Sequence, residues 1–315
     1  MRIKEFTEQI AKGIEASIAG VTATPTQTWK NNGVIQHGIT FRKNDEKVSP
    51  VLYLNQWFKR FNKGELSAQD ILEQVIREYK CLPEVDIPDM EEWLSSDDFI
   101  NTITIHLVNR EANKKMITAR NLVSYALENT DLTCLFYAKV ISDGSTSGEI
   151  AISEYLLHRY LPKIVNGEAL YHEVVKRINE DTIRFEPISN IVNRMVEEMT
   201  GEVSHFSIKE DFMFVLSNMA MTHGASAILA EAARKMILER IPDGKVTMLP
   251  SSVHETIIIP TVEDEDVEVL GKMVQQVNKS ELSKEDMLSN NVFHYDANTG
   301  KLEVAEPVES EGDEE

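Results

Sequence analysis

A polar junction at residues 251–255 holds the side chains of this sequence that are best suited to chemistry. Ser251, Ser252, His254 and Glu255 place two hydroxyls, an imidazole and a carboxylate between two apolar runs. In an extended chain Ser252 and His254 point to one face and Glu255 to the other. Ser252 and His254 could therefore be the nucleophile and the general base of a small hydrolase, with a carboxylate from elsewhere orienting the imidazole. The alternative is a tight turn in which the serine hydroxyls bond to backbone amides and His254 packs on a sheet.

A second polar cluster has the same character. Ser217 and Asn218 end the apolar run 212–216, and His223 follows shortly after. If the two clusters lie at one edge of a sheet, they form a single polar patch. In that arrangement His223 is a further catalytic candidate, and Ser251 and Asn218 are candidate binding residues.

The familiar cofactor and metal motifs are absent from the sequence. It contains neither the P-loop pattern nor the GxGxxG dinucleotide fingerprint. Residues 144–148 resemble a nucleophile elbow only in outline, because Thr146 stands at the centre and the flanks are polar. His254-Glu255 begins like a zinc-protease helix, but Ile258 stands where the second histidine belongs. The 8 histidines include no pair at the i,i+2 or i,i+4 spacing, so we predict neither a metal nor a cofactor.

The first 82 residues predict a small lobe with a helix, an antiparallel sheet and a second helix. Apolar residues recur every three or four positions over 3–18, which indicates a helix with one buried face. Short β-rich runs then follow, and Asn32-Gly33 between two of them is a strong hairpin signal. Ser67 and Asp70 form the pattern of a capping box at the start of the second helix.

A larger lobe, 99–304, follows an acidic linker, 83–98, that contains Pro83 and Pro88. Residues 102–108 alternate between polar and apolar, as in a half-buried strand. The pattern then predicts further elements: a helix capped by Ser189, a buried strand over 212–216, a short strand over 224–229, a helix over 231–241, strands over 245–249 and 255–259, a helix over 264–278 and a turn over 143–148. The expected fold is α+β in two lobes, the second a mixed α/β unit, and residues 305–315 are expected to be a disordered acidic tail.

The charge is concentrated at the carboxyl end. The net charge is −20, and residues 261–315, with 16 acids and 4 bases, carry −12 of it. This balance argues against direct nucleic-acid binding, which needs clustered Lys and Arg. The acidic segment could contact a basic protein partner or mimic nucleic-acid phosphates, and the simpler alternative is a solubility tail.

The remaining composition favours a cytoplasmic protein. No run approaches the length of a membrane span, and the amphipathic start of the chain contains acids and is unlike a signal peptide. The 2 cysteines cannot make a disulfide framework.

Several stretches resemble an uncharacterised bacterial family that is known only as a domain of unknown function. They include residues 31–34, 53–55, 212–218 and 223–226, and the LeuProSerSerValHisGlu stretch from Leu249 is the most specific. The resemblance implies an origin in gut-type Gram-positive anaerobes, often near mobile-element genes, and it brings no activity, cofactor or catalytic residue.

Each catalytic candidate in the sequence is explained at least as well by a structural role, such as a turn. A non-enzymatic interaction or regulatory protein is therefore the leading interpretation. The Ser252/His254 hydrolase and the acidic mimic of nucleic acid are the alternatives.

Overall fold

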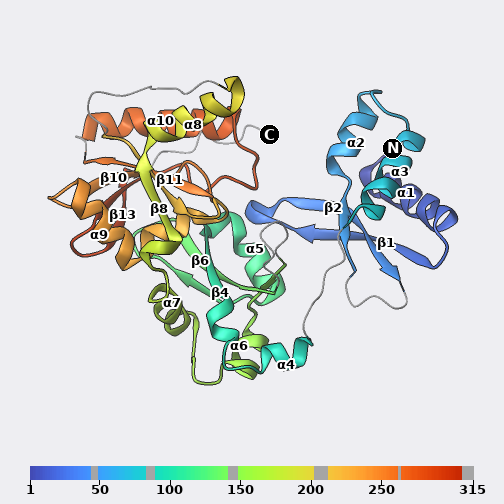
Figure 1. Ribbon diagram of the computed structural model, residues 1–315, viewed down its shortest axis with the longest axis horizontal. Helices are drawn as coiled ribbons and strands as arrows, with labels where there is room; N and C mark the ends of the chain where they lie inside the picture. The colour runs from blue at the N-terminus through green and yellow to red at the C-terminus, as the bar shows by residue number, and fades with distance from the viewer. Residues whose placement is uncertain (44–48, 83–88, 141–147, 202–211, 262–263, 307–315) are drawn as a thin grey trace. The chain divides into compact units, whose positions relative to one another are not determined.

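The chain forms two units, Met1–Trp93 and Leu94–Glu315, each with its own core. The computed structural model describes residues 1–43, 49–82, 89–140, 148–201, 212–261 and 264–306 (Figure 1). The boundary lies within the segment 83–98 that the sequence assigns to a linker. The later part of that segment forms helix α4 (Met90–Leu94), and Leu94 is buried. The α+β prediction is confirmed, because helices accompany three antiparallel sheets among the described residues.

The smaller unit packs three helices against a sheet of three strands. Its elements in chain order are α1 (Ile3–Ser17), β1 (Val21–Trp29), the short helix η1 (Asn31–Gly33), β2 (Ile35–Lys43), β3 (Val51–Tyr53), α2 (Asn55–Asn62) and α3 (Ala68–Lys80). The apolar stripe of α1 is buried against the sheet and α3, and Phe6, Ile14 and Phe41 are fully inaccessible to solvent. The predicted capping box is present: the Ser67 backbone N–H donates to Asp70 Oδ2 at 2.9 Å, and Ser67 Oγ accepts from the Asp70 N–H at 3.2 Å.

The larger unit begins with a four-stranded sheet in which β6 (Leu132–Lys139) is the centre. This strand pairs with β4 (Ile103–Asn109) on one edge and with the short strands β5 (Ser124–Ala126) and β7 (Glu149–Ala151) on the other. The helical segments around this sheet are η2 (Phe99–Thr102), α5 (Arg110–Arg120), α6 (Glu154–Tyr160) and α7 (Gly167–Val175).

A six-stranded sheet completes the larger unit. Its strands, in spatial order, are β13 (Lys301–Glu306), β12 (Val292–Asp296), β10 (Lys245–Leu249), β11 (Glu255–Pro260), β9 (Phe214–Asn218) and β8 (Ile183–Pro187). The helical segments of this part are η3 (Glu180–Thr182), α8 (Ile188–Thr200), η4 (Gly224–Leu229), α9 (Glu231–Arg240) and α10 (Asp264–Ser280). Helix α10 buries Val267 and Val274 against Leu249 and Val292 of the sheet.

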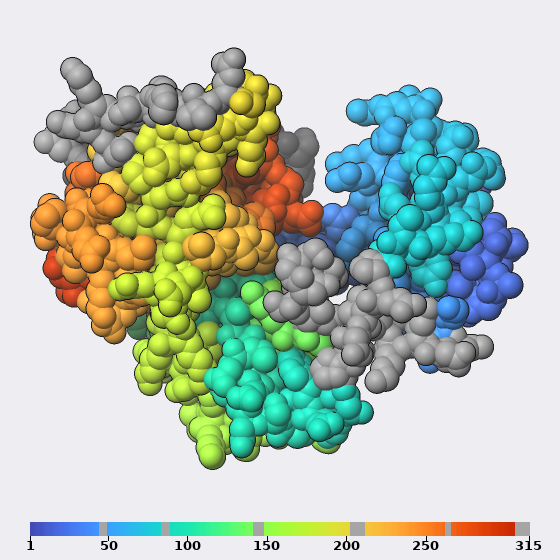
Figure 2. Space-filling view, in the orientation of Figure 1, coloured from blue at the N-terminus to red at the C-terminus, as the bar shows by residue number. Residues whose placement is uncertain are grey.

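The short helix η4 links the two sheets of the larger unit. It packs against β9 and β11 of the six-stranded sheet and against β4 of the other sheet. Tyr295 Oη on β12 donates to the Ile228 carbonyl at 3.0 Å, which holds η4 from the side of the six-stranded sheet. In the space-filling view the light orange residues that follow β9 lie against the yellow-green residues near β8 (Figure 2). The segment between β9 and α9 is therefore positioned by both sheets.

Helices and strands are mixed in the larger unit as expected, and every strand pair among its described residues is antiparallel. Several predictions for this unit are wrong in detail. Residues 224–229 form a 3-10 helix and not a strand. Helix α8 begins at Ile188 after Pro187, so Ser189 lies inside the helix and does not cap it. Strand β9 starts at Phe214, and Phe212 is 52% exposed.

The predictions for the acidic tail and for the turn over 143–148 fall mostly outside the described residues. The first two residues of the expected tail, Ala305 and Glu306, belong to β13, where strand pairing with β12 orders them. No helix among the described residues has both the length and the apolar character needed to cross a lipid bilayer.

Candidate functional site

The two polar clusters lie together where strand β9 ends and strand β11 begins, within the six-stranded sheet. Strands β9 and β11 are antiparallel neighbours, and their register pairs Glu255 with Ser217, so the end of β9 meets the start of β11. The ring centroids of His223 and His254 are 5.4 Å apart. The single polar patch expected from the sequence is therefore present.

Gly224 makes this close approach possible. A Cβ atom at this position would lie 2.1 Å from Ser217 Oγ, 2.5 Å from the Asn218 backbone nitrogen and 2.6 Å from the His254 carbonyl oxygen. Real Cβ atoms do not approach other atoms so closely, so only glycine fits between the ends of β9 and β11. Ser217 Oγ closes the contact by donating to the His254 carbonyl at 2.7 Å.

Both ring nitrogens of His254 have partners. The His223 backbone N–H donates to His254 Nδ1 at 3.1 Å, and His254 Nε2 lies 3.2 Å from Asp286 Oδ1. Because Nδ1 accepts a hydrogen bond, the proton of the neutral ring is on Nε2, from which it is donated to the Asp286 carboxylate. The imidazole therefore has no free nitrogen with which to accept a proton from a serine.

Ser252 has the geometry of a turn residue. It is buried, and its Oγ accepts the His254 backbone N–H at 3.0 Å. The Ser252 backbone N–H donates to the Glu255 carbonyl at 3.1 Å. This arrangement favours the turn alternative over a nucleophile and base pair, and the catalytic roles of Ser252, His254 and Glu255 remain predictions.

The two candidate binding residues also bond locally. Ser251 Oγ lies 3.4 Å from Glu255 Oε1. Asn218 Nδ2 donates to the Thr222 carbonyl at 2.7 Å, and Asn218 Oδ1 accepts the Thr222 N–H at 3.2 Å. Asn218 lines a pocket, described below, whereas Ser251 is not among the lining residues.

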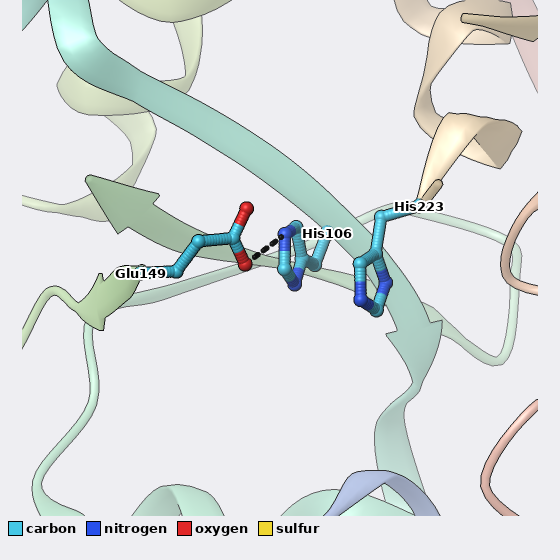
Figure 3. A group of neighbouring side chains, drawn as sticks. All are labelled: His106, Glu149 and His223. Carbon is cyan, nitrogen blue, oxygen red and sulfur yellow. Dashed lines mark ion pairs between the residues drawn. The ribbon is translucent and has the colours of Figure 1, made fainter. Parts of the chain in front are cut away.

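Two further side chains, which the sequence analysis did not single out, complete a cluster with His223. His106 on β4 stacks on His223, with ring centroids 3.6 Å apart and planes at 9°. The other face of the His106 ring stacks on Tyr137 of β6 at 4.1 Å. His106 Nε2 lies 3.3 Å from Glu149 Oε2 on β7 (Figure 3).

The register of the four-stranded sheet explains why His106 and Glu149 meet. Thr104 pairs with Tyr137, and Lys139 pairs with Glu149. Directly paired residues of antiparallel strands project from the same face, and so do residues two apart on one strand. Thr104, His106, Tyr137, Lys139 and Glu149 therefore share one face, and η4 brings His223 to it.

A pocket of about 390 Å³ opens at this cluster. His106, Glu149 and His223 line it together with Lys139. Its apolar lining includes Ile103, Ile105, Val174, Ile178 and Ile183 from β4, the region of α7 and the start of β8, together with Met219, Ala220 and Ala227 from the segment after β9. The pocket thus has an apolar part and a polar part.

The environment sets the charge of two of these groups. Burial lowers the pKa of His223 to about 3, and neighbouring His106 acts in the same direction, so the imidazole is neutral at pH 7. Burial raises the pKa of Glu149, but the hydrogen bond and the charge of His106 outweigh burial and lower the pKa below its ordinary value. Glu149 is therefore an anion at pH 7.

A pattern in the sequence could have indicated His106 but not its partners. The alternation over 102–108 puts His106 on the same face as Thr104, which makes it a polar residue on a half-buried strand. Glu149 and His223 come from other elements, and no spacing rule joins them to His106.

One comparison with known proteins found a match. A family model described as "Family of unknown function (DUF5688)" matches residues 3–297. Neither the curated proteins nor the solved structures contain a significant match.

Proposed function

Because the chain belongs to the DUF5688 family, whose description assigns no activity, we propose from the geometry that it is a small-molecule-binding interaction or regulatory protein. The ligand site is the pocket of the larger unit. The ligand class is a small zwitterion with an apolar body, such as a free amino acid.

The pocket itself is the observation that carries this proposal. Its volume of about 390 Å³ is within the range of about 300–1,000 Å³ that is typical of ligand sites. Apolar side chains form one part of the lining, while convergent polar groups form another. Such a combination buries the body of a ligand and orients its head.

Opposite charges in the lining favour a zwitterion. Lys139 and Glu149 are paired across strands β6 and β7, and both line the pocket. Arg177 and Asp181 also contribute to the lining, although Arg177 Nη2 already bonds to Glu173 Oε1 at 2.7 Å. A ligand carboxylate is complementary to Lys139, and a ligand ammonium group is complementary to the Glu149 carboxylate.

The backbone beside the pocket supports a binding role. Met221 and His223 both have left-handed conformations, with φ of 52° and 51°. Residues other than glycine adopt this region at a cost of about 1–3 kcal/mol, and such strain is concentrated at ligand clamps and active sites. Here it places the His223 ring on the polar face of the four-stranded sheet.

The hydrolase alternative is weaker because its two central groups have other partners. The Ser252 hydroxyl accepts a backbone N–H, and His254 has partners at both ring nitrogens.

We also propose that the protein acts in the cytoplasm, where Cys81 and Cys134 remain free thiols as in the structure. Its acidic carboxyl-terminal segment is the proposed contact for a protein partner.

Three probes with one apolar body test the ligand class. L-phenylalanine carries both charges, 3-phenylpropanoate carries only the carboxylate, and 2-phenylethylamine carries only the ammonium group. Their affinities for the full-length protein are measured by isothermal titration calorimetry with EDTA present. A hydrogen bond to a charged group contributes about 1.5–3 kcal/mol, so L-phenylalanine should bind at least about tenfold more tightly than either analogue.

One pair of variants assigns the charges, and a second pair tests the location of the site. Lys139→Met should weaken the binding of L-phenylalanine and 3-phenylpropanoate about tenfold and leave 2-phenylethylamine unchanged; Glu149→Gln should have the converse effect on the two analogues. Thr104→Trp fills the pocket and should abolish binding, whereas Thr299→Trp in the exposed turn before β13 should not. The proposal fails if none of the probes binds at millimolar concentration or if Thr104→Trp binds as the wild type does.

A further inference from the structure

His106, Glu149 and His223 form a group of metal-ligating side chains. Each offers one ligand atom, and these atoms lie within 4.8 Å of one another (Figure 3). We propose that the three side chains bind one divalent transition-metal ion, with Zn²⁺ as the representative ion. This inference does not depend on the proposed function, because it rests on the three ligand atoms alone; Glu149 serves both sites, so the zwitterion is tested separately, in EDTA.

The chemistry of the donor set selects the class of ion. Two imidazole nitrogens and one carboxylate oxygen suit Zn²⁺ and its first-row neighbours, whereas Mg²⁺ and Ca²⁺ prefer sites made only of oxygen. Zinc sites with two histidines and one glutamate keep the fourth position open for water or for a ligand. All three residues line the pocket, so a fourth position would face the pocket.

An unpaired ring nitrogen at the cluster agrees with metal binding. His223 Nδ1 is buried without a hydrogen-bond partner among the described residues. A buried nitrogen of this kind is rare and calls for a partner such as an ion.

Metal binding requires a small rearrangement of side chains. Ligand atoms at about 2.0–2.2 Å from a tetrahedral ion lie roughly 3.3–3.5 Å apart, which is closer than the 4.8 Å limit of the present cluster. The His106 and His223 planes are within 9° of parallel, so their lone pairs do not converge on one point. The His223 ring must therefore turn relative to His106, and metal binding is expected to break the ring stack.

The surroundings decide which ring moves. His106 is held in strand β4 and is only 6% exposed. His223 lies in the segment before η4, and the backbone N–H of His223 is anchored by His254 Nδ1. This anchor holds the backbone of His223 and does not involve its ring. The predicted mover is thus the His223 ring.

The test uses the full-length protein after removal of metal with a chelator. Zn²⁺ is titrated by calorimetry, and Co²⁺ is added in a parallel sample to record its visible absorption. We expect one Zn²⁺ per chain and a Co²⁺ spectrum of tetrahedral intensity. The histidine ¹⁵N resonances of His106 and His223 should shift on Zn²⁺ binding, while those of His294 should not.

Three variants make the assignment specific. His223→Asn removes the imidazole and introduces a residue that tolerates the left-handed backbone. Glu149→Gln removes the carboxylate charge. Each variant should weaken Zn²⁺ binding at least tenfold. His158→Ala is the control, because His158 and Glu154 form an exposed histidine and carboxylate pair at 3.5 Å on α6. It should leave the affinity unchanged.

Some outcomes would overturn the inference. These are the absence of Zn²⁺ binding, an affinity that both site variants retain, or an affinity that His158→Ala removes. Circular dichroism of each variant confirms that it is folded before it is titrated. Binding of L-phenylalanine in EDTA is unaffected by these outcomes, so failure of the metal site and failure of the proposed function are distinguishable.

Discussion

Replacing Gly224 by alanine should destabilise the larger unit through one crowded contact. The added Cβ atom meets Ser217 Oγ at 2.1 Å and two backbone atoms, of Asn218 and His254, at 2.5 and 2.6 Å. The serine hydroxyl can turn away, but the backbone atoms lie at the paired ends of β9 and β11 and can move only if these strand ends separate. Overpacking of this kind costs about 1–3 kcal/mol, and loss of the bond from Ser217 to the His254 carbonyl adds about 1 kcal/mol.

The positions of the tryptophans allow each unit to be followed separately. Trp29 and Trp57 lie within the smaller unit, Trp93 is its last residue, and the larger unit contains no tryptophan. In urea unfolding of the full-length Trp93→Phe variant, tryptophan emission therefore reports the smaller unit, while the remaining change in circular dichroism reports the larger one. A loss of about 3 kcal/mol should lower the midpoint of the larger unit by roughly 1 M urea and leave the tryptophan transition in place.

Two controls separate crowding from other effects. Gly201→Ala at the end of α8 meets no atom within 4 Å but has a φ of 72°, so it should cost only the roughly 1–2 kcal/mol of left-handed strain. Ser217→Ala combined with Gly224→Ala removes one of the three obstacles, so the double variant should lose less stability than the sum of the single variants. If Gly224→Ala unfolds at the wild-type midpoint, the close approach of these strand ends is not as described.

Three other predictions concern the site and the smaller unit. Ser252→Ala should cost about 1 kcal/mol of unfolding free energy, because the His254 N–H loses its acceptor, and should leave L-phenylalanine affinity unchanged. The unfolded chain protonates His223 near pH 6.5 but the folded chain only near 3, so this residue stabilises the fold above pH 6.5 and the contribution is lost as pH falls from there towards 3. The slope should be at most about 1.4 kcal/mol per pH unit, and urea unfolding of His223→Asn should show a smaller slope. Phe6→Ala removes a ring that is 0% exposed and should lower the unfolding free energy of the smaller unit, followed by tryptophan emission, by about 3–5 kcal/mol. It should not change L-phenylalanine affinity.

The sequence predicts those elements whose period is strong and local. The stripe of α1 and the capping box of α3 are confirmed. Residues 103–109 form a strand as predicted, but β4 is buried on both faces and not half-buried, because His106 and Val108 are covered as well as Ile105 and Leu107. Helix α5 is missed because only Asn113 and Met116 of its residues are buried. Its sequence therefore lacks the apolar stripe that identifies a helix on the surface of a domain.

Short apolar runs mislead because both strands and buried helices contain them. Residues 224–229 are small and apolar and were expected to form a strand, yet they form η4. The deciding constraint is tertiary: Gly224 must fit between β9 and β11, and the Ile228 carbonyl accepts the Tyr295 hydroxyl. Neither constraint can be read from the run itself.

Some residues of the candidate site can be predicted from their local sequence, whereas others meet only through the pairing of distant strands. Asn218, His223 and His254 can be found because each stands beside an apolar run, where a polar residue is conspicuous. His106 lies within a run, and Glu149 follows the segment 141–147, so neither is conspicuous by position. Their meeting depends on the β4–β6–β7 register, which pairs Thr104 with Tyr137 and Lys139 with Glu149. A one-residue slip of β7 would move the Glu149 carboxylate to the opposite face, so this register is the physical condition for both the charged lining of the pocket and the proposed metal site.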